Sequence, residues 1–466
     1  MNRIILIGNG FDLAHNLRTS YRNFIDDYWD KKNELLQKRY KESEIKSYED
    51  YEDKDIIVRN ITWWQTSSFN NNEKKYGYNM FVDRLRQGHV RGNLHFKNHF
   101  LKRITENAVI NSWVDIENEY YEELKNVLNR LNPYGKDAKL LNRHFNQIKI
   151  ELEKYLTETL KLKLTNGTEK IIGLEHLIYS KFSFADFTQK GKDNLIDIAY
   201  QKILSLKEKD EKQELSMLDT SEETMTLYDN IKTLVSKNTP IIHESLVYSF
   251  DTREDFVKLL DKRKDMIDIS SLLLPENVLF LNFNYTNTED KYSINNPINN
   301  YFANKTENYK QEFKINQETI HIHSELNNRK NPIIFGYGDE LDDDYKQILK
   351  KNDNNLLENV KSIKYGETYN YKRLLNFIES DNYQVFIMGH SCGNSDRTLL
   401  NTLFEHTNCQ SIKIFYHKKV NGQEESDDFS NIYRNVTRNF KNFANLRAKV
   451  VDKSNSISFP QLEKNN

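Results

Sequence analysis

The segment Gly8-Asn9-Gly10-Phe11-Asp12 combines a glycine-rich backbone with a carboxylate, and it directly follows the apolar run Arg3 to Ile7. A strand, a glycine-paired turn and a helix form the arrangement in which backbone N–H groups and a helix N-terminus bind a pyrophosphate. The third glycine of the usual dinucleotide motif is missing. A structural turn, in which glycine supplies unusual backbone angles and Asp12 caps the helix, is therefore the alternative.

A second polar segment, Asn282 to Glu289, follows the apolar run Val278-Leu279-Phe280 and contains three side-chain amides and two threonine hydroxyls. Amides orient hydroxyl groups and water without carrying charge. Open α/β sheets bind their ligands at the carboxyl ends of the strands, where this segment is expected. A ligand-orienting role for these amides is the functional hypothesis, and an asparagine-rich turn is the alternative.

Two histidines, His321 and His323, are separated by one residue and followed by Ser324. The period of two of a strand predicts both imidazoles on one face. Without a nearby cysteine or third histidine a metal pair is disfavoured, and no metal is expected. A single catalytic or ligand-orienting histidine is favoured over a metal pair. A histidine satisfied within the polar edge of a sheet is the alternative.

The segment Gly389-His390-Ser391-Cys392-Gly393 matches the GxSxG pattern of the α/β-hydrolase nucleophile elbow and lies between an apolar run and a helical pattern. A hydrolase of this kind needs an acid and then a histidine downstream. The acids that follow are Asp396 and Glu405, and the histidines are His406 and His417, all in or just beyond the next helix. A glycine turn that supplies backbone donors to a ligand, with Ser395 or Asp396 capping the helix, is favoured over a Ser391 hydrolase.

The elements that position these residues follow from the apolar pattern. Runs typical of strands occur at Arg3 to Ile7, Val278 to Phe283, Thr319 to His323, Pro332 to Phe335, Tyr383 to Met388, Ser411 to Tyr416 and Ala448 to Val451. One predicted strand is therefore N-terminal, and the others follow residue 275. We predict an α/β fold with a Rossmann-like, mostly parallel sheet formed by residues 1–24 and 271–466, interrupted by a large α-helical insertion at residues 25–270.

Within the insertion the apolar residues recur at helical spacing. The stripes Ile116 to Leu131 and Leu141 to Leu160 predict two amphipathic helices that face a core. The mixed-charge run Lys207 to Gln213 predicts a solvated helix face or loop. The asparagine-rich stretch Asn295 to Tyr309 predicts a loop.

The composition excludes several classes of protein. The chain of 466 residues has 67 Lys plus Arg against 69 Asp plus Glu, a formal charge of -2 that argues against direct nucleic-acid binding. The two cysteines exclude a disulfide framework and a multi-cysteine zinc module. The sequence contains neither a signal-peptide pattern at its start nor an apolar run long enough for a membrane span. We therefore expect a cytoplasmic protein without a membrane partner.

Taken together, the ordered motifs resemble the bacteriophage abortive infection AbiH family over nearly the whole chain. The motifs are Ile7 to Ala14, Thr19-Ser20-Tyr21, Trp113 to Glu117, Phe283-Asn284-Tyr285-Thr286, and Gly389-His390-Ser391 with Asp396. Their order is similar, more distantly, to sirtuin-like NAD-hydrolysing domains of antiphage systems. Thr286 stands where those domains have Asp, Ser324 stands where they have Gly, and the four-cysteine zinc module of protein deacylases is absent.

The resemblance implies an antiphage effector that binds NAD and hydrolyses its nicotinamide-ribose bond, an NAD glycohydrolase. It implies catalytic roles for Asn284 and His323. Asp115 or Glu117 could join them from the insertion, and a surface or N-cap role is the alternative for these two acids. It also implies NAD contacts by Gly8, Asn9, Gly10, Asp12, Gly389, Ser391 and Asp396. A nucleotide-sensing regulator or toxin without turnover is the alternative, and a Ser391 hydrolase is a third. The partners expected are a small-molecule nucleotide and, where activation requires them, a phage-derived trigger and further copies of the chain.

Overall fold

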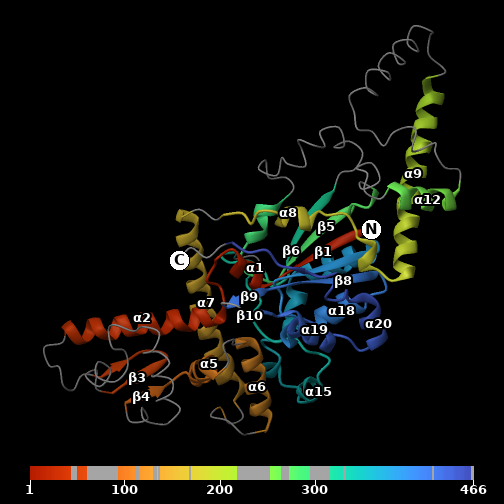
Figure 1. The fold of residues 1–466 in the computed structure, drawn as a ribbon. Helices are drawn as coiled ribbons and strands as arrows, with labels where there is room; N and C mark the ends of the chain where they lie inside the picture. The colour runs from red at the N-terminus through yellow and green to blue at the C-terminus, as the bar shows by residue number, and fades with distance from the viewer. Residues whose placement is uncertain are drawn as a thin grey trace.

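The computed structural model describes residues 1–42, 50–59, 93–110, 115–129, 134, 137–166, 169–217, 252–263, 272–293, 315–328, 332–421 and 424–462. Figure 1 shows a central sheet with a group of helices on one side of the molecule and the long α9 helix projecting on the other.

The centre of the fold is a six-stranded sheet with the order β11-β8-β7-β1-β5-β6. All of its pairings are parallel. The strands are β1 (Asn2–Ile7), β5 (Asn277–Asn282), β6 (Asn316–His321), β7 (Tyr383–Met388), β8 (Cys409–Tyr416) and β11 (Ile457–Ser458). This confirms the predicted α/β fold with a Rossmann-like sheet.

The path of the chain through the sheet fixes where a ligand is expected. From β1 the chain passes to β5 and then β6 on one side, and it then crosses to β7, β8 and β11 on the other side. This is the 3-2-1-4-5-6 order of Rossmann folds, with the topological switch point between β1 and β7. In open α/β sheets the ligand crevice lies outside the carboxyl ends of the strands at that point.

Helices cover both faces of the sheet because alternate strand residues point to opposite sides. On one face Leu6, Leu281 and Ile387 pack with α17 (Asn370–Ser380), α18 (Arg397–Glu405), α19 (Phe429–Arg438) and α20 (Phe443–Lys449). On the other face Ile5 and Phe280 pack with α1 (Asn9–Ala14), α8 (Leu174–Ile178) and η2 (Thr288–Tyr292). The strands are buried on both faces, as expected for a parallel sheet.

A second hydrophobic core lies among the helices at the lower left of Figure 1. It contains α2 (Tyr21–Glu42), α5 (His99–Ile110), α6 (Ile116–Asn129) and α7 (Ala138–Asn166), so the two helices predicted from apolar stripes are present. The same range also holds a small antiparallel sheet of β2 (Tyr51–Glu52), β3 (Ile56–Val58) and β4 (Leu94–Phe96). We refer to α2, β2–β4 and α5–α7 as the helical part.

The remaining elements are shorter or lie at the periphery: η1 (Phe184–Asp186), α9 (Gln189–Met217), α12 (Arg253–Arg263), α15 (Asp343–Lys350), η4 (Asn354–Leu356), α16 (Lys361–Lys364), η5 (Tyr365–Glu367), η6 (Asn394–Asp396), β9 (Lys418–Asn421) and β10 (Glu424–Asp427). The charged run Lys207 to Gln213 is part of the α9 helix. The loop predicted at Asn295 to Tyr309 lies outside the described residues.

Two of the predicted strands are wrong. Pro332 to Phe335 is apolar because it lies between two cores, not because it joins a sheet: Ile334 packs in the sheet core and Phe335 in the core of the helical part. Ala448 is in α20, and Val450 makes only an isolated bridge to Ile412.

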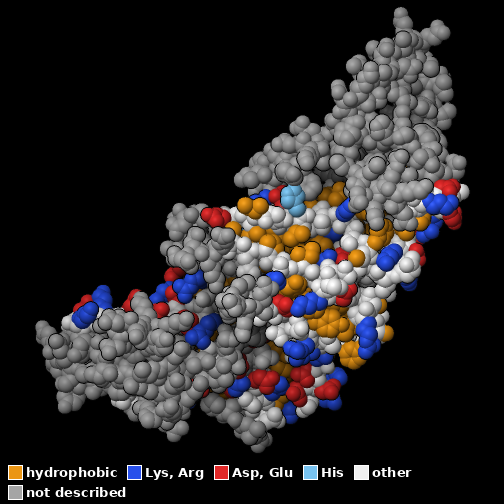
Figure 2. Space-filling view, viewed as in Figure 1, with side chains coloured by type: hydrophobic (Ala, Val, Ile, Leu, Met, Phe, Trp, Pro, Cys, Tyr) orange, Lys and Arg blue, Asp and Glu red, His pale blue; other side chains and the backbone are white. Residues whose placement is uncertain are grey.

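On the face of the molecule in Figure 2, basic and acidic side chains are interspersed over the coloured surface. Among the helices of the described ranges, none is long and apolar enough to cross a membrane.

Candidate functional site

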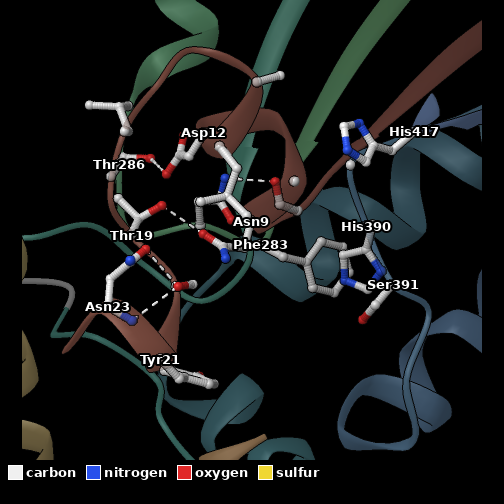
Figure 3. Close-up of a pocket in the computed structure, with 18 of the residues that line it drawn as sticks. Asn9, Asp12, Thr19, Tyr21, Asn23, Phe283, Thr286, His390, Ser391 and His417 are labelled. Carbon is white, nitrogen blue, oxygen red and sulfur yellow. Dashed lines mark hydrogen bonds between the residues drawn. The ribbon is translucent and has the colours of Figure 1, made fainter. Parts of the chain in front are cut away.

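A cavity of about 1300 Å³ lies at the carboxyl ends of β1, β5 and β7, at the switch point of the sheet. Figure 3 shows Asp12, Thr19 and Thr286 on one side of it and His390, Ser391 and His417 on the other. Every residue predicted to act in the site lines this cavity: Gly8, Asn9, Gly10, Asp12, Asn284, His323, Gly389, Ser391 and Asp396. The structure therefore brings together four segments that are far apart in the sequence.

The glycines of the two turns allow backbone to pack directly on backbone. Gly389 has a φ of +77°, and a Cβ atom there would lie 2.1 Å from the backbone nitrogen of Phe11. A Cβ atom on Gly10 would lie 2.8 Å from the Cα atom of Gly389. Any side chain at these positions would force the β1 and β7 turns apart, so the glycines have a structural function whatever they bind.

The amides of the first turn are used within the protein. The N–H of Gly10 donates to the carbonyl of Gly389 over 2.8 Å, and that of Gly8 donates to Met388 over 3.5 Å. The following helix, α1, has only six residues. The N–H groups of these two glycines are therefore engaged within the protein in this structure.

Asp12 is a buried carboxyl on the cavity wall. The hydroxyl of Thr286 donates to its Oδ2 atom over 2.7 Å, and Oδ1 has no hydrogen-bond partner among the described residues. Burial raises the pKa of Asp12 to about 6, because the hydroxyls around it offset only part of the desolvation. Gly8 occupies the cap position of α1 without a side-chain cap, so the alternative role of Asp12 as a helix cap is wrong.

Asn284 is fixed against the β1 turn. Its Nδ2 atom donates to the carbonyl of Gly8 over 3.0 Å, and its backbone N–H donates to Oδ1 of Asn282 over 2.8 Å. Asn282 in turn donates to a carboxylate oxygen of Glu289, which fixes the end of β5. The Asn284 amide is thus held rigidly at the cavity by two neighbouring strands.

His323 is buried at the cavity, and both of its ring nitrogens have polar neighbours. Its Nδ1 atom lies 3.2 Å from the carbonyl oxygen of Phe283, which can only accept, and the Tyr365 hydroxyl near Nε2 can donate, so we assign the proton of the neutral ring to Nδ1. Its Nε2 atom lies 3.2 Å from the hydroxyl of Tyr365 and 3.1 Å from Oδ1 of Asp396. Burial and the charge of Lys361 lower the pKa of His323 to about 4, although Asp396 opposes them. The ring is therefore neutral near pH 7 and can accept a proton at Nε2.

The predicted common face of the two histidines is wrong. Strand β6 ends at His321, and the chain then turns through Ser324, which has a φ of +70°. His321 contacts Glu289 at 2.9 Å and Glu325 at 3.1 Å, away from the partners of His323. Ser324 therefore adopts a left-handed backbone conformation that glycine adopts more easily.

The residue that sequence reasoning missed is Lys361. Its ammonium lies 2.8 Å from Oδ1 of Asp396 and 2.9 Å from Oε2 of Glu117, and the side chain is fully buried. Both carboxylates line the cavity. Lys361 lies in the segment Val360-Lys361-Ser362-Ile363-Lys364, whose sequence resembles an ordinary surface helix and contains no signal of burial.

The acids suggested from the insertion, Asp115 and Glu117, also reach the cavity. Burial raises the pKa of Glu117 to about 8 and that of Asp115 to about 6. Oδ1 of Asp115 also accepts the backbone N–H groups of Glu117 and Asn118, so it has the N-cap role that was its alternative. Trp113 and Val114 of the same motif lie outside the described residues.

The environment of Ser391 differs from that of a hydrolase nucleophile. Its side chain is exposed, and within the described ranges no histidine forms a hydrogen bond with its Oγ atom. The neighbouring His390 uses Nδ1 to accept the N–H of Cys392 over 2.9 Å, and Cys392, not Ser391, has the positive φ of +54°. Asp396 occupies the cap position of α18 without a capping bond, because its oxygens face Lys361 and the histidines.

The other triad candidates are divided between the cavity and the opposite end of α18. Glu405 accepts from the side chain of Asn401, and His406 stacks on Tyr383 at the amino end of β7. His417 does line the cavity. None of these contacts links an acid to a histidine and then to Ser391.

These features define a Rossmann-like α/β protein with a polar, ionisable cavity at the switch point of its sheet. Residues 4–418 match the model of the family described as Bacteriophage abortive infection AbiH. The match spans most of the chain, so the protein belongs to the AbiH family, and this membership indicates a role in abortive infection. Neither the curated proteins nor the solved structures provide a match. The similarity to sirtuin-like domains remains a prediction.

Proposed function

We propose that this protein is an abortive-infection effector that binds NAD in the switch-point cavity and hydrolyses the nicotinamide-ribose bond. The observation that carries the proposal is that Asn284 and His323, from two neighbouring strand ends, line one cavity with the turns that contain Gly8 and Gly389. Ligand pockets generally have volumes of about 300–1,000 Å³. A cavity of about 1300 Å³ has room for a dinucleotide.

The reaction requires few protein groups. The bond between C1 of the ribose and the pyridinium nitrogen breaks, and its electron pair leaves with nicotinamide. Water adds to the oxocarbenium-like carbon and loses a proton, giving ADP-ribose. Asn284 is placed to hold the water or a ribose hydroxyl, and the Nε2 lone pair of His323 accepts the proton. A pKa of about 4 keeps this base unprotonated at neutral pH.

The charge of the cavity also fits a transition state with positive charge on the ribose. Asp12 and the ionised Asp396 lie on its walls, and carboxylates stabilise developing positive charge. Arg18, an exposed side chain on the same cavity, is available to the pyrophosphate. The ligand is thus expected to place its nicotinamide riboside near His323 and its phosphates toward Arg18.

Two other functions of the cavity, NAD sensing without turnover and a Ser391 hydrolase, predict different experimental results. In a sensor or toxin without turnover, the same cavity binds NAD and releases it intact. In a Ser391 hydrolase, chemistry depends on Ser391 and not on His323. The exposed Ser391 without a bound histidine favours the NAD proposal over this hydrolase.

The test is to incubate purified protein with NAD and quantify nicotinamide and ADP-ribose by chromatography. We expect nicotinamide release by the wild type, a loss of at least about 100-fold in His323→Ala and Asn284→Ala, and in Ser391→Ala a much smaller loss that appears as a raised KM for NAD. His95→Ala, an exposed histidine on β4, is the matched control. NAD that is bound but recovered intact would support the sensor, and activity that is lost only in Ser391→Ala would support the hydrolase. Absence of NAD binding would refute the proposal.

A further inference from the structure

A buried chain of charged groups connects the helical part to His323. Glu117 of α6 contacts Lys361, Lys361 contacts Asp396, and Asp396 contacts Nε2 of His323, over 2.9, 2.8 and 3.1 Å. Lys361 does not line the cavity, so it reaches a ligand only through its two carboxylates.

The backbone around Lys361 is fixed tightly. Its N–H donates to the carbonyl of Tyr337 over 2.9 Å, and Val360 forms a bridge with Tyr337. Gly336 lies so close to Asn359 that a Cβ atom would come within 2.1 Å of its carbonyl oxygen. The N–H of Gly336 also donates to Glu117 over 3.1 Å. The ammonium is therefore held in one place by both the segment 336–361 and α6.

Without a cation, the contact between His323 and Asp396 would trap a proton. With the proton of the neutral ring assigned to Nδ1, the Nε2 lone pair faces the Tyr365 hydroxyl at 3.2 Å and an ionised carboxylate oxygen at 3.1 Å. Two electron-rich atoms at that distance attract a proton between them, which would turn the base into an imidazolium. The ammonium, 2.8 Å from the same oxygen, balances the negative charge instead.

We propose that Lys361 is a positioning residue for His323: its ammonium holds Asp396 as an ionised carboxylate and keeps the Nε2 lone pair of His323 available to take a proton. The proposal rests on the proposed function only in assigning that proton to the hydrolysis of NAD. The protonation of His323 itself is measurable without any substrate.

The charged and titratable groups that face His323 come from several elements. Asp396 on η6 and Lys361 on α16 have opposite effects on its protonation, and the others are Tyr365 on η5, Tyr285 after β5 and His390 after β7. Removing Lys361 alone leaves Asp396 as the dominant charge. The pair of Asp396 and His323 should then bind a proton at higher pH.

The experiment is a pH titration of the His323 imidazole by NMR in the full-length protein, with ¹³C-labelled histidine and His323→Ala to assign the signal. In the wild type we expect the ring to remain neutral down to about pH 5, because its pKa is lowered to about 4. In Lys361→Met we expect the transition to move upward by about one pH unit or more. Lys346→Met removes an exposed lysine from its pair with Asp343 and should leave the transition unchanged.

Removing one partner of a buried ion pair strongly destabilises a protein, so a second variant is measured in case Lys361→Met does not fold. Lys361→Met/Glu117→Gln removes the ammonium together with the carboxyl group of Glu117 that contacts it, and it leaves Asp396 beside His323. We expect the pH of the His323 transition to move upward in this double variant as in Lys361→Met. An unchanged transition of His323 in either folded variant would overturn the proposal.

The pH dependence of NAD hydrolysis should shift in the same direction as the NMR transition of His323. In the wild type and Lys346→Met the acid limb of the kcat/KM profile for NAD should coincide, and in Lys361→Met it should move upward with the NMR transition. A purely structural role would lower the rate at all pH values without moving this limb, which would contradict the proposal. If no variant hydrolyses NAD but the NMR transition moves, the proposed function fails and the positioning of His323 stands.

Discussion

Burial controls the protonation of single side chains around the cavity. The walls contain carboxyls whose pKa is raised, Asp12 and Asp115 to about 6 and Glu117 to about 8, next to the ionised Asp396 that contacts Lys361. Desolvation disfavours the charged form, and nearby cations and hydrogen bonds oppose it; at Asp396 they outweigh it. The site therefore contains neutral and ionised acids together, which is a common property of active sites.

Asp12 allows the effect of burial on the pKa of a carboxyl group to be tested at a single residue. Its carboxyl titrates at about 6 in the folded protein and near 3.8 unfolded, so the folded state binds more protons between these values. The contribution of Asp12 to the stability of the wild type therefore falls as the pH rises from 4 to 6. Asp12→Asn cannot ionise and should gain about 1–3 kcal/mol relative to the wild type across this window, measured by chemical unfolding at pH 4 and pH 7.

The control for Asp12 is Asp343→Asn. Asp343 is exposed, and its bond to Lys346 lowers its pKa, so this variant should show a small change of opposite sign. A stability difference between Asp12→Asn and the wild type that is independent of pH would contradict the assignment.

At the scale of elements, the site is built by contact between two turns. The β1 turn and the β7 turn pack through Gly8, Gly10 and Gly389, and the β5 end joins them through Asn284. These parallel strands come from opposite ends of the sequence. Their register is what brings the predicted residues together.

A comparison of two glycines isolates this contact. Gly389 and Gly173 both have positive φ, +77° and +82°, but a Cβ atom at Gly173 would meet nothing within 4 Å. Gly173→Ala should cost only the strain of its backbone, about 1–2 kcal/mol. Gly389→Ala should cost clearly more and should abolish NAD binding, as measured by thermal unfolding and calorimetry. Equal losses of stability with retained binding would show that the turn contact is not required.

How far the sequence predicts this architecture depends on how local each signal is. Strands β1, β5 and β7 are predicted because each is a short apolar run followed directly by a polar turn, and α6 and α7 because their stripes are periodic. The failure at Pro332 to Phe335 arises because burial between two cores looks the same as burial in a sheet. Lys361 is not predicted at all, because its burial depends on Glu117 and Asp396, which approach it only in the folded chain.

At the scale of the whole molecule, the cavity belongs to both parts of the protein. Tyr21, Asp115, Glu117 and Leu152 reach it from the helical part, while His323 and Asp396 reach it from the sheet. The segment 332–361 joins the two cores through Ile334 and Phe335. A signal that acts on the helical part would therefore act directly on the walls of the site.

The most direct test of the central claim is the NAD content of bacteria that express this protein during phage infection, because the infected cell supplies any trigger. We expect NAD to fall with matching accumulation of nicotinamide and ADP-ribose in wild-type cells, and to remain at the uninfected level in His323→Ala cells with equal amounts of protein. Protection against the phage without any fall in NAD in wild-type cells would contradict the claim.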